Sequence, residues 1–186
     1  DFCLSRGLGD VYKRQEYKVI KHILNSAGIE RFTDYQMDMV RLGIGLYGVS
    51  ASGQKGLRNI STLKTTILQI QNVPAGDSIG YSRMSYVKRD SRIAIIPIGY
   101  ADGLDRHFSN GGGEVVINGH RCPIIGNICM DACMIDVTDT DAHEGDSVII
   151  FGEELPVSEL SDKLKTIPYE ILTSISPRVK RVYYRE

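Results

Sequence analysis

Short apolar segments separated by turn residues recur from residue 65 to residue 151, and they constrain the fold of this chain more than any other feature. Their length and β-branched composition are typical of strands, and glycines punctuate the turns between them. The segments lie at 65–71, 93–98, 114–117, 120–125, 133–137 and 146–151. Asn118-Gly119, between the third and the fourth segments, is a strong two-residue hairpin signal. Six strands at this spacing predict a barrel or a sandwich.

Helical signals return only near the C-terminal end. Ser158 can cap a helix that has Glu159 in its first turn. Pro168 can open a second short helix that runs through Leu172. We therefore expect residues 59–186 to form a mostly-β domain with short helices at its end.

Residues 16–58 lack this pattern of strands. The apolar residues of 16–26 fit a short helix and a buried strand equally well. A helical stretch around 35–40 leads into 41–50, where apolar residues interrupted by glycines favour a buried strand in a crowded setting. Residues 51–58 have the composition of a linker.

Composition and charge exclude several classes of protein. The chain has 22 Lys+Arg against 23 Asp+Glu, a net charge of -1, which argues against a broad phosphate-binding surface. The longest apolar run, 93–98, is far shorter than the roughly 20 residues that a membrane-spanning helix needs. The four cysteines form no CxxC pair and fit reduced thiols, so we expect a cytoplasmic protein without a metal site.

Six strings of residues occur in the same order as in the alanine racemase family, and together they cover about residues 16–186. They are KHILNSAG (21–28), VRLGIGLYG (40–48), GYS (80–82), IPIGYADGL (96–104), GNICMDACMIDVT (126–138) and SISPRVKR (174–181). The chain thus resembles a family of pyridoxal-phosphate enzymes with an N-terminal (β/α)8 barrel and a C-terminal β domain. The resemblance implies an α/β remnant at 16–58, the last strands of a truncated barrel, followed by a complete β-barrel-like domain at 59–186.

Such an enzyme interconverts L-alanine and D-alanine, supplies D-alanine for peptidoglycan, and works as a homodimer with active sites shared between subunits. The resemblance implies that Tyr81 is a catalytic base on one face of the substrate Cα, opposite a lysine that holds the cofactor. Racemisation needs two bases because one removes the proton and the other returns it from the other side. A free phenol has a pKa of about 10, so this role requires cationic neighbours.

Five residues match the cofactor contacts of the family. Arg41 would donate a hydrogen bond to the pyridine nitrogen of pyridoxal phosphate, and His22 would brace Arg41. An arginine leaves that nitrogen unprotonated, and the resulting weaker electron sink favours rapid reprotonation of the substrate. Ser26 and the amides of Gly43 and Ile44 would bind the cofactor phosphate.

Three further residues match the substrate contacts of the family. Tyr100 would line the substrate entrance, while the amide of Met130 and the neighbouring Asp131 would lie beside the substrate carboxylate. One position departs from the pattern. Many members have a tyrosine in a Ser-Tyr-Arg-Val context that reaches the cofactor phosphate, but this chain has Pro177, which carries no hydroxyl.

The first half of such an enzyme has no counterpart here. No segment matches the motif of the Schiff-base lysine, because Lys13 and Lys21 lack its neighbours. The chain begins at Asp1 rather than Met, and residues 1–15 show no periodicity, so we expect a non-native or disordered leader there. The resemblance therefore predicts a C-terminal fragment that is inactive by itself.

Two other functions remain open. A β-barrel could bind single-stranded nucleic acid through basic and aromatic residues near the C-terminal end, although the net charge argues against it. These residues are Arg178, Lys180, Arg181, Tyr183, Tyr184 and Arg185. The chain could instead be a non-catalytic module that dimerises or holds the cofactor beside an intact partner.

Overall fold

A computed structural model describes residues 19–53, 56–83 and 85–184. The expectation of a leader at 1–15 lies outside these described residues. The chain divides into two compact units, Asp1–Arg58 and Asn59–Glu186, which we call unit 1 and unit 2.

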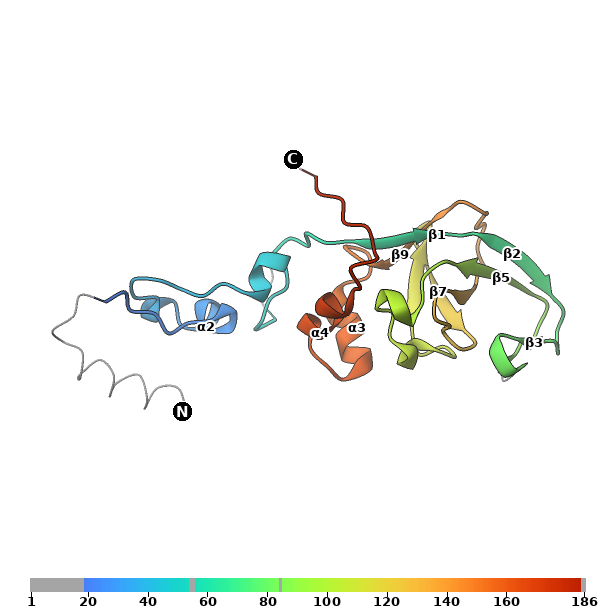
Figure 1. Ribbon diagram of the computed structural model, residues 1–186, viewed down its shortest axis with the longest axis horizontal. Coiled ribbons are helices and arrows are strands. Elements are labelled where there is room, and N and C mark those ends of the chain that lie inside the picture. Colours follow the sequence, from blue (N-terminus) through green and yellow to red (C-terminus); the bar gives the residue numbers. More distant parts are fainter. Residues whose placement is uncertain (1–18, 54–55, 84, 185–186) are drawn as a thin grey trace. The chain divides into compact units, whose positions relative to one another are not determined.

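Unit 1 is built around two extended segments that run in the same direction (Figure 1). The Asp38 amide donates to the Lys21 carbonyl at 3.1 Å, and the Arg41 amide donates to the Leu24 carbonyl at 2.9 Å. The constant offset of these pairs is the register of parallel chains. Between them lie helix α2 (Ser26–Arg31) and the single 3-10 turn η1 (Thr33–Tyr35), and η2 (Ile44–Tyr47) follows.

Two expectations for unit 1 are wrong. The buried strand expected at 41–50 is an extended stretch that gives way to η2 and ends at Gly48, whose φ of 75° is left-handed. The helix expected around 35–40 does not form, because Asp38 and Arg41 direct their amides to the first extended segment instead of to a helical turn. Pairing with a distant segment overrides the local pattern in both places.

Within its described residues, unit 2 contains a seven-stranded antiparallel sheet with the strand order β1-β9-β6-β7-β8-β5-β2 (Figure 1). The strands are β1 (Leu63–Thr66), β2 (Gln69–Val73), β5 (Ser91–Ile96), β6 (Glu114–Ile117), β7 (His120–Ile125), β8 (Cys133–Asp136) and β9 (Ser147–Phe151). All six predicted strands are confirmed, with the first split into β1 and β2. Asn118 and Gly119 have φ of 49° and 77°, as the predicted hairpin requires.

The two edge strands of this sheet follow one another in the chain, and this closes the sheet into a barrel-like form. The amide of Ile67 donates to the Asp146 carbonyl beside β9, and the amide of Leu68 donates to the Ile95 carbonyl in β5. The continuous stretch from β1 to β2 therefore bonds to β9 on one side of the sheet and to β5 on the other. The interior is filled by fully buried branched side chains, which include Ile96, Ile117, Ile135 and Val148.

A small hairpin of β3 (Ser78–Ile79) and β4 (Ser85–Tyr86) carries the turn η3 (Tyr81–Arg83). Two more such turns, η4 (Tyr100–Asp102) and η5 (Arg106–Phe108), follow β5. Near the C-terminal end lie α3 (Val157–Leu164) and α4 (Pro168–Ser174). Helix α3 begins one residue before the expected cap, after Pro156, and α4 begins at the predicted proline. None of the helices in the described parts of the chain is long and apolar enough to cross a membrane.

Candidate active site

In unit 1 the hydroxyl of Ser26 is an acceptor for backbone amides at the start of η2. It accepts hydrogen bonds from the amides of Gly43 at 2.9 Å and Gly45 at 3.4 Å, and Ser26 is buried. The side chain of Asn25 caps α2 by accepting from the Gly28 amide, and this cap fixes Ser26 at the first helical position. The Ser26 oxygen thus occupies the place of an acceptor for two amides of this loop, and a phosphate oxygen could replace it there.

Arg41 and His22 lie on the two paired segments of the same unit. The Arg41 guanidinium is exposed and donates to the Ile23 carbonyl at 3.1 Å. A guanidinium has five donor N–H groups, so Arg41 can hold a further acceptor, such as a ring nitrogen. His22 is exposed, and no hydrogen bond joins it to Arg41 within the described part of unit 1. The bracing role of His22 stays a prediction.

Tyr81 lies in unit 2 at the tip of the β3–β4 hairpin. The preceding Gly80 has a left-handed φ of 75°, and a Cβ there would lie 2.8 Å from Met134 Cε and 3.8 Å from the Asn127 nitrogen. The hairpin therefore rests on the loop at 126–132, while the Tyr81 side chain is 77% exposed. The phenol is accessible to a substrate.

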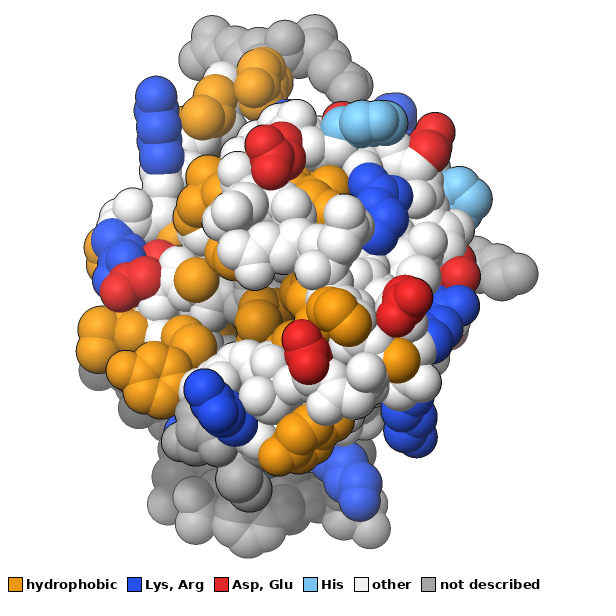
Figure 2. Space-filling model, turned by 90° about the vertical axis from the view of Figure 1, so that its right-hand side faces the viewer, with side chains coloured by type: hydrophobic (Ala, Val, Ile, Leu, Met, Phe, Trp, Pro, Cys, Tyr) orange, Lys and Arg blue, Asp and Glu red, His pale blue; other side chains and the backbone are white. Residues whose placement is uncertain are grey.

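A groove of about 340 Å³ lies beneath this hairpin. Its lining includes the apolar residues Ile79, Ile93 and Met134 and polar residues of β2 and of the turn after it. Figure 2 shows this end of the molecule, where apolar side chains lie in a hollow between charged ones.

Tyr100 and Met130 are held together by the backbone. The Tyr100 amide donates to the Cys129 carbonyl and the Ala101 amide donates to the Met130 carbonyl, both at 3.0 Å. Only a glycine allows this approach, because a Cβ on Gly99 would lie 2.3 Å from the Cys129 oxygen. The structure thus brings two of the three predicted substrate residues side by side.

Both side chains at this junction are partly open to solvent. Tyr100 is 44% exposed and Met130 is 53% exposed. The Arg106 guanidinium lies 6.0 Å from the centre of the Tyr100 ring, which is the range of a cation–π contact. In the part of the chain that the structure describes, the Met130 amide makes no hydrogen bond, so it can donate to a carboxylate.

Asp131, the third predicted substrate residue, is bound to a residue that sequence reasoning did not place in this site. Arg178 Nη2 donates to Asp131 Oδ1 at 2.5 Å, and Arg178 Nε lies 3.0 Å from Asp102 Oδ1. The hydrogen bond with Asp131, followed by the charge of Asp102, raises the pKa of Arg178 above its ordinary value. The sequence offered one sign that Arg178 belongs to the site, which is that it follows Pro177 in the family-like segment SISPRVKR (174–181).

Two of the cysteines are unsuited to nucleophilic chemistry. Burial, with a smaller contribution from the charge of Asp136, raises the pKa of Cys122 to about 11. Burial, with a smaller contribution from Cys129, raises the pKa of Cys133 to about 12. Both side chains therefore stay protonated thiols near neutral pH. Across the described ranges, no three His, Cys, Asp or Glu side chains are arranged to hold a metal ion.

Comparisons with known proteins give one consistent result. The family model "Alanine racemase, C-terminal domain" matches residues 60–183, and "Alanine racemase, N-terminal domain" matches residues 4–51. The chain is 44% identical over 187 aligned residues to alanine racemase 2 of Caldanaerobacter subterraneus subsp. tengcongensis, an alignment that covers 94% of this chain and 48% of the relative.

Solved structures agree with this result. Alanine racemase from Bacillus anthracis with bound L-Ala-P superposes with a TM-score of 0.87 at 34% identity, covering 96% of this chain and 49% of that one. The enzyme from Bartonella henselae with covalently bound pyridoxal phosphate has a TM-score of 0.82 at 41% identity, covering 87% and 46%. The chain spans about half the length of these relatives, and it belongs to the alanine racemase family.

Proposed function

We propose that this chain provides the second catalytic base and part of the cofactor and substrate contacts of an enzyme that interconverts L-alanine and D-alanine. The observation that carries the proposal is the match of residues 60–183 to the C-terminal domain of alanine racemases, together with the junction of Tyr100 and Met130 in the same unit. The working enzyme would be a homodimer with active sites shared between its subunits.

The donors of unit 1 suit the cofactor of this reaction. Ser26 and the amides of Gly43 and Ile44 would hold the phosphate of pyridoxal phosphate, with the Gly43 amide exchanging its bond to the Ser26 hydroxyl for one to the phosphate. Arg41 would donate to the ring nitrogen of the cofactor. When bound, pyridoxal phosphate supplies an electron sink that acidifies the Cα–H of an amino acid. A guanidinium donates a hydrogen bond without giving up its proton, so Arg41 would keep this sink weak. His22 would act on the orientation of Arg41.

The residues of unit 2 would handle the substrate. Tyr81 would transfer a proton to or from Cα on one face, and the cofactor-binding lysine of the complete enzyme would serve the other face. The Met130 amide would bind the alanine carboxylate, with Asp131 beside it, and Tyr100 would line the substrate entrance. A base on each face is what inversion at Cα requires, because the proton leaves and returns on opposite sides.

The test is racemisation by a complete enzyme, made by joining this chain to the N-terminal half of a relative. Tyr81→Phe is expected to lower kcat by about 10³-fold, the usual effect of losing a proton-transferring group. One alanine enantiomer should still exchange its Cα proton with deuterium from solvent, because the base on the other face remains. Tyr86→Phe removes another exposed hydroxyl from the same hairpin and should keep full activity. Full racemisation by Tyr81→Phe would contradict the assignment.

We also infer that the chain by itself does not racemise alanine, because none of its segments matches the motif of the Schiff-base lysine. Pyridoxal phosphate added to the chain alone should give no visible absorbance that borohydride fixes covalently to the protein. A fixed chromophore on one lysine would show that the chain carries its own cofactor lysine.

A further inference from the structure

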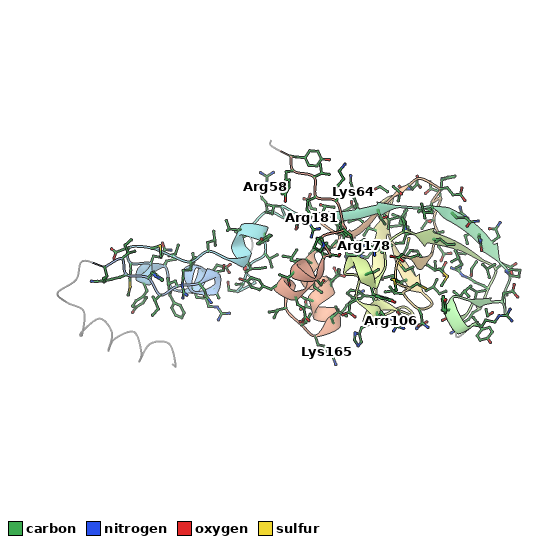
Figure 3. The ribbon with its side chains drawn as sticks, viewed as in Figure 1. Arg58, Lys64, Arg106, Lys165, Arg178 and Arg181 are labelled. Atoms are coloured by element: carbon green, nitrogen blue, oxygen red, sulfur yellow. The ribbon has the colours of Figure 1, made fainter. Side chains whose placement is uncertain are left out.

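Three segments of unit 2 meet at the side chain of Arg178. Its Nε faces Asp102, which lies in the turn η4, and its Nη2 faces Asp131, which follows Met130 in the loop at 126–132. Arg178 itself comes from the segment after α4 (Figure 3). One guanidinium therefore bridges the two loops that carry Tyr100 and Met130.

The two ends of this bridge differ in burial. The Asp102 side chain is 11% exposed. Its Oδ2, the oxygen that does not face Arg178, accepts a hydrogen bond from the Gly99 amide at 2.9 Å. The Asp131 side chain is 59% exposed, and Arg178 is the partner to which it is bound. A nearly buried carboxylate needs a positive partner, so the inner end is a fixed anchor. The outer end holds an exposed residue that directly follows Met130 in its loop.

The segment that carries Arg178 is itself attached to the same turn. The Ser176 amide donates to the Asp102 carbonyl at 3.0 Å. Arg181 donates to three carbonyls of its own segment, those of Ile175 at 2.8 Å, Ser176 at 2.6 Å and Val179 at 2.7 Å. Arg178 is therefore presented from a folded segment, not from a free end of the chain.

We propose that Arg178 is a positioning residue, which uses Asp102 as an anchor to hold Asp131 and, through it, the neighbouring Met130 amide in place for the substrate carboxylate. This inference rests on the proposed racemase function. A planar guanidinium directs separate N–H groups to two carboxylates at once, whereas the single ammonium of lysine does not match that geometry. The carboxylate contact is the same in the substrate and in the transition state, so its loss should raise KM more than it lowers kcat.

Kinetics of the complete enzyme test this role. Arg178→Gln is expected to raise KM for alanine about tenfold with kcat within about twofold, and Arg178→Lys should recover only part of the loss. Lys180→Gln removes a positive charge from the same segment and should keep the original KM. A loss confined to kcat, or an unchanged KM, would overturn the proposal.

A double-mutant cycle separates action through Arg178 from direct action by Asp131. Asp131→Asn should raise KM, but Arg178→Gln with Asp131→Asn should be no worse than Arg178→Gln alone, because both changes remove one contact. Additive effects would mean that Asp131 binds the substrate independently of Arg178.

Amide hydrogen exchange in this chain tests the positioning role without any substrate. Arg178→Gln should speed exchange of the Tyr100 and Ala101 amides about tenfold and leave those of β7 unchanged. Unchanged protection at both amides would overturn the role whatever the enzyme does, whereas an inactive complete enzyme would refute the racemase function alone. If Arg178→Gln does not fold, Asp131→Asn replaces it, because this change leaves the Asp102 anchor intact. Faster exchange of the Tyr100 and Ala101 amides is again expected, and unchanged protection would again overturn the role.

Discussion

At the residue scale, Glu30 shows how one carboxylate fixes a loop in unit 1. It accepts hydrogen bonds from the Ser50 hydroxyl at 2.7 Å, from the amides of Ala51 at 3.1 Å and Ser52 at 3.0 Å, and from the Ser52 hydroxyl. The bond from the Ser52 hydroxyl is the largest of the causes that lower the pKa of Glu30 from 4.5 to about 2. The loop after η2 is thereby attached to helix α2.

This attachment should depend on pH. A carboxylate with a lowered pKa in the folded state stabilises that state fully above its unfolded pKa, and it loses the contribution as pH falls through the folded pKa. Protection factors of the Ala51 and Ser52 amides should therefore be constant above about pH 4.5 and fall toward pH 2. Hydrogen exchange followed by NMR measures them.

Two variants complete this test. Glu30→Gln should show low protection at these amides already at pH 5, with little further change on acidification. Glu153→Gln removes an exposed carboxylate from a loop of unit 2 and should keep the original profile. The same acid profile in Glu30→Gln as in the unmodified chain would show that another group controls this loop.

At the element scale, closure of the sheet in unit 2 depends on the two residues that join β1 to β2. Ile67 is 2% exposed, and its carbonyl accepts the Gly145 amide at 2.8 Å while its amide donates to Asp146. Leu68, the next residue, is 58% exposed and bonds to the opposite edge of the sheet. Neighbouring side chains in one extended stretch thus point into and out of the barrel-like core.

Truncation of these neighbours should separate packing from backbone pairing. Ile67→Ala is expected to lower the free energy of unfolding by about 3 kcal/mol, because it leaves a cavity in the core. Leu68→Ala keeps the same backbone bonds and should cost less than about 0.5 kcal/mol. Urea unfolding followed by circular dichroism measures both. If Ile67→Ala lowered the free energy of unfolding as little as Leu68→Ala is expected to, Ile67 would not pack in the core.

At the scale of the whole molecule, the two units differ in how many apolar side chains they bury. Unit 1 exposes Phe32, Tyr35, Met37 and Leu46, each more than half accessible. Unit 2 has a sheet whose edges meet and whose branched side chains fill a common interior. The second unit therefore contains its own core, whereas in the described part of the first unit the buried apolar side chains are those of Leu24 and Ile44.

This difference predicts the behaviour of a shortened chain. Residues 59–186 alone should fold and unfold at the same thermal midpoint as the β-rich transition of the chain described here. Binding of a hydrophobic dye should be weaker to residues 59–186 than to the chain with unit 1 present, because the deletion removes the exposed side chains of Phe32, Tyr35, Met37 and Leu46. An unfolded 59–186 chain would show that unit 2 depends on unit 1.

The sequence predicted the strands of unit 2 because their signals are local. β-branched composition, regular turns and the Asn118-Gly119 pair act over a few residues, and the hairpin formed where they indicated. Local signals failed at 41–50, where bonds to Leu24 and Ser26 shape the chain, and at β3 and β4, which are only two residues long. The roles of the site residues remain predictions that no contact in the structure tests.

Six ordered strings of residues were enough to determine the family and the domain that this chain contributes. The chemistry of a site requires particular residue types at fixed spacing, and such a pattern can be read directly from the sequence. Only the tertiary structure showed that Gly99 lets one loop lie against another and that Arg178 bridges Asp102 and Asp131. An ion pair between residues far apart in the chain leaves no periodicity in the sequence. The ion pairs of Arg178 form because the folded sheet brings together the turn with Asp102, the loop with Asp131 and the segment after α4.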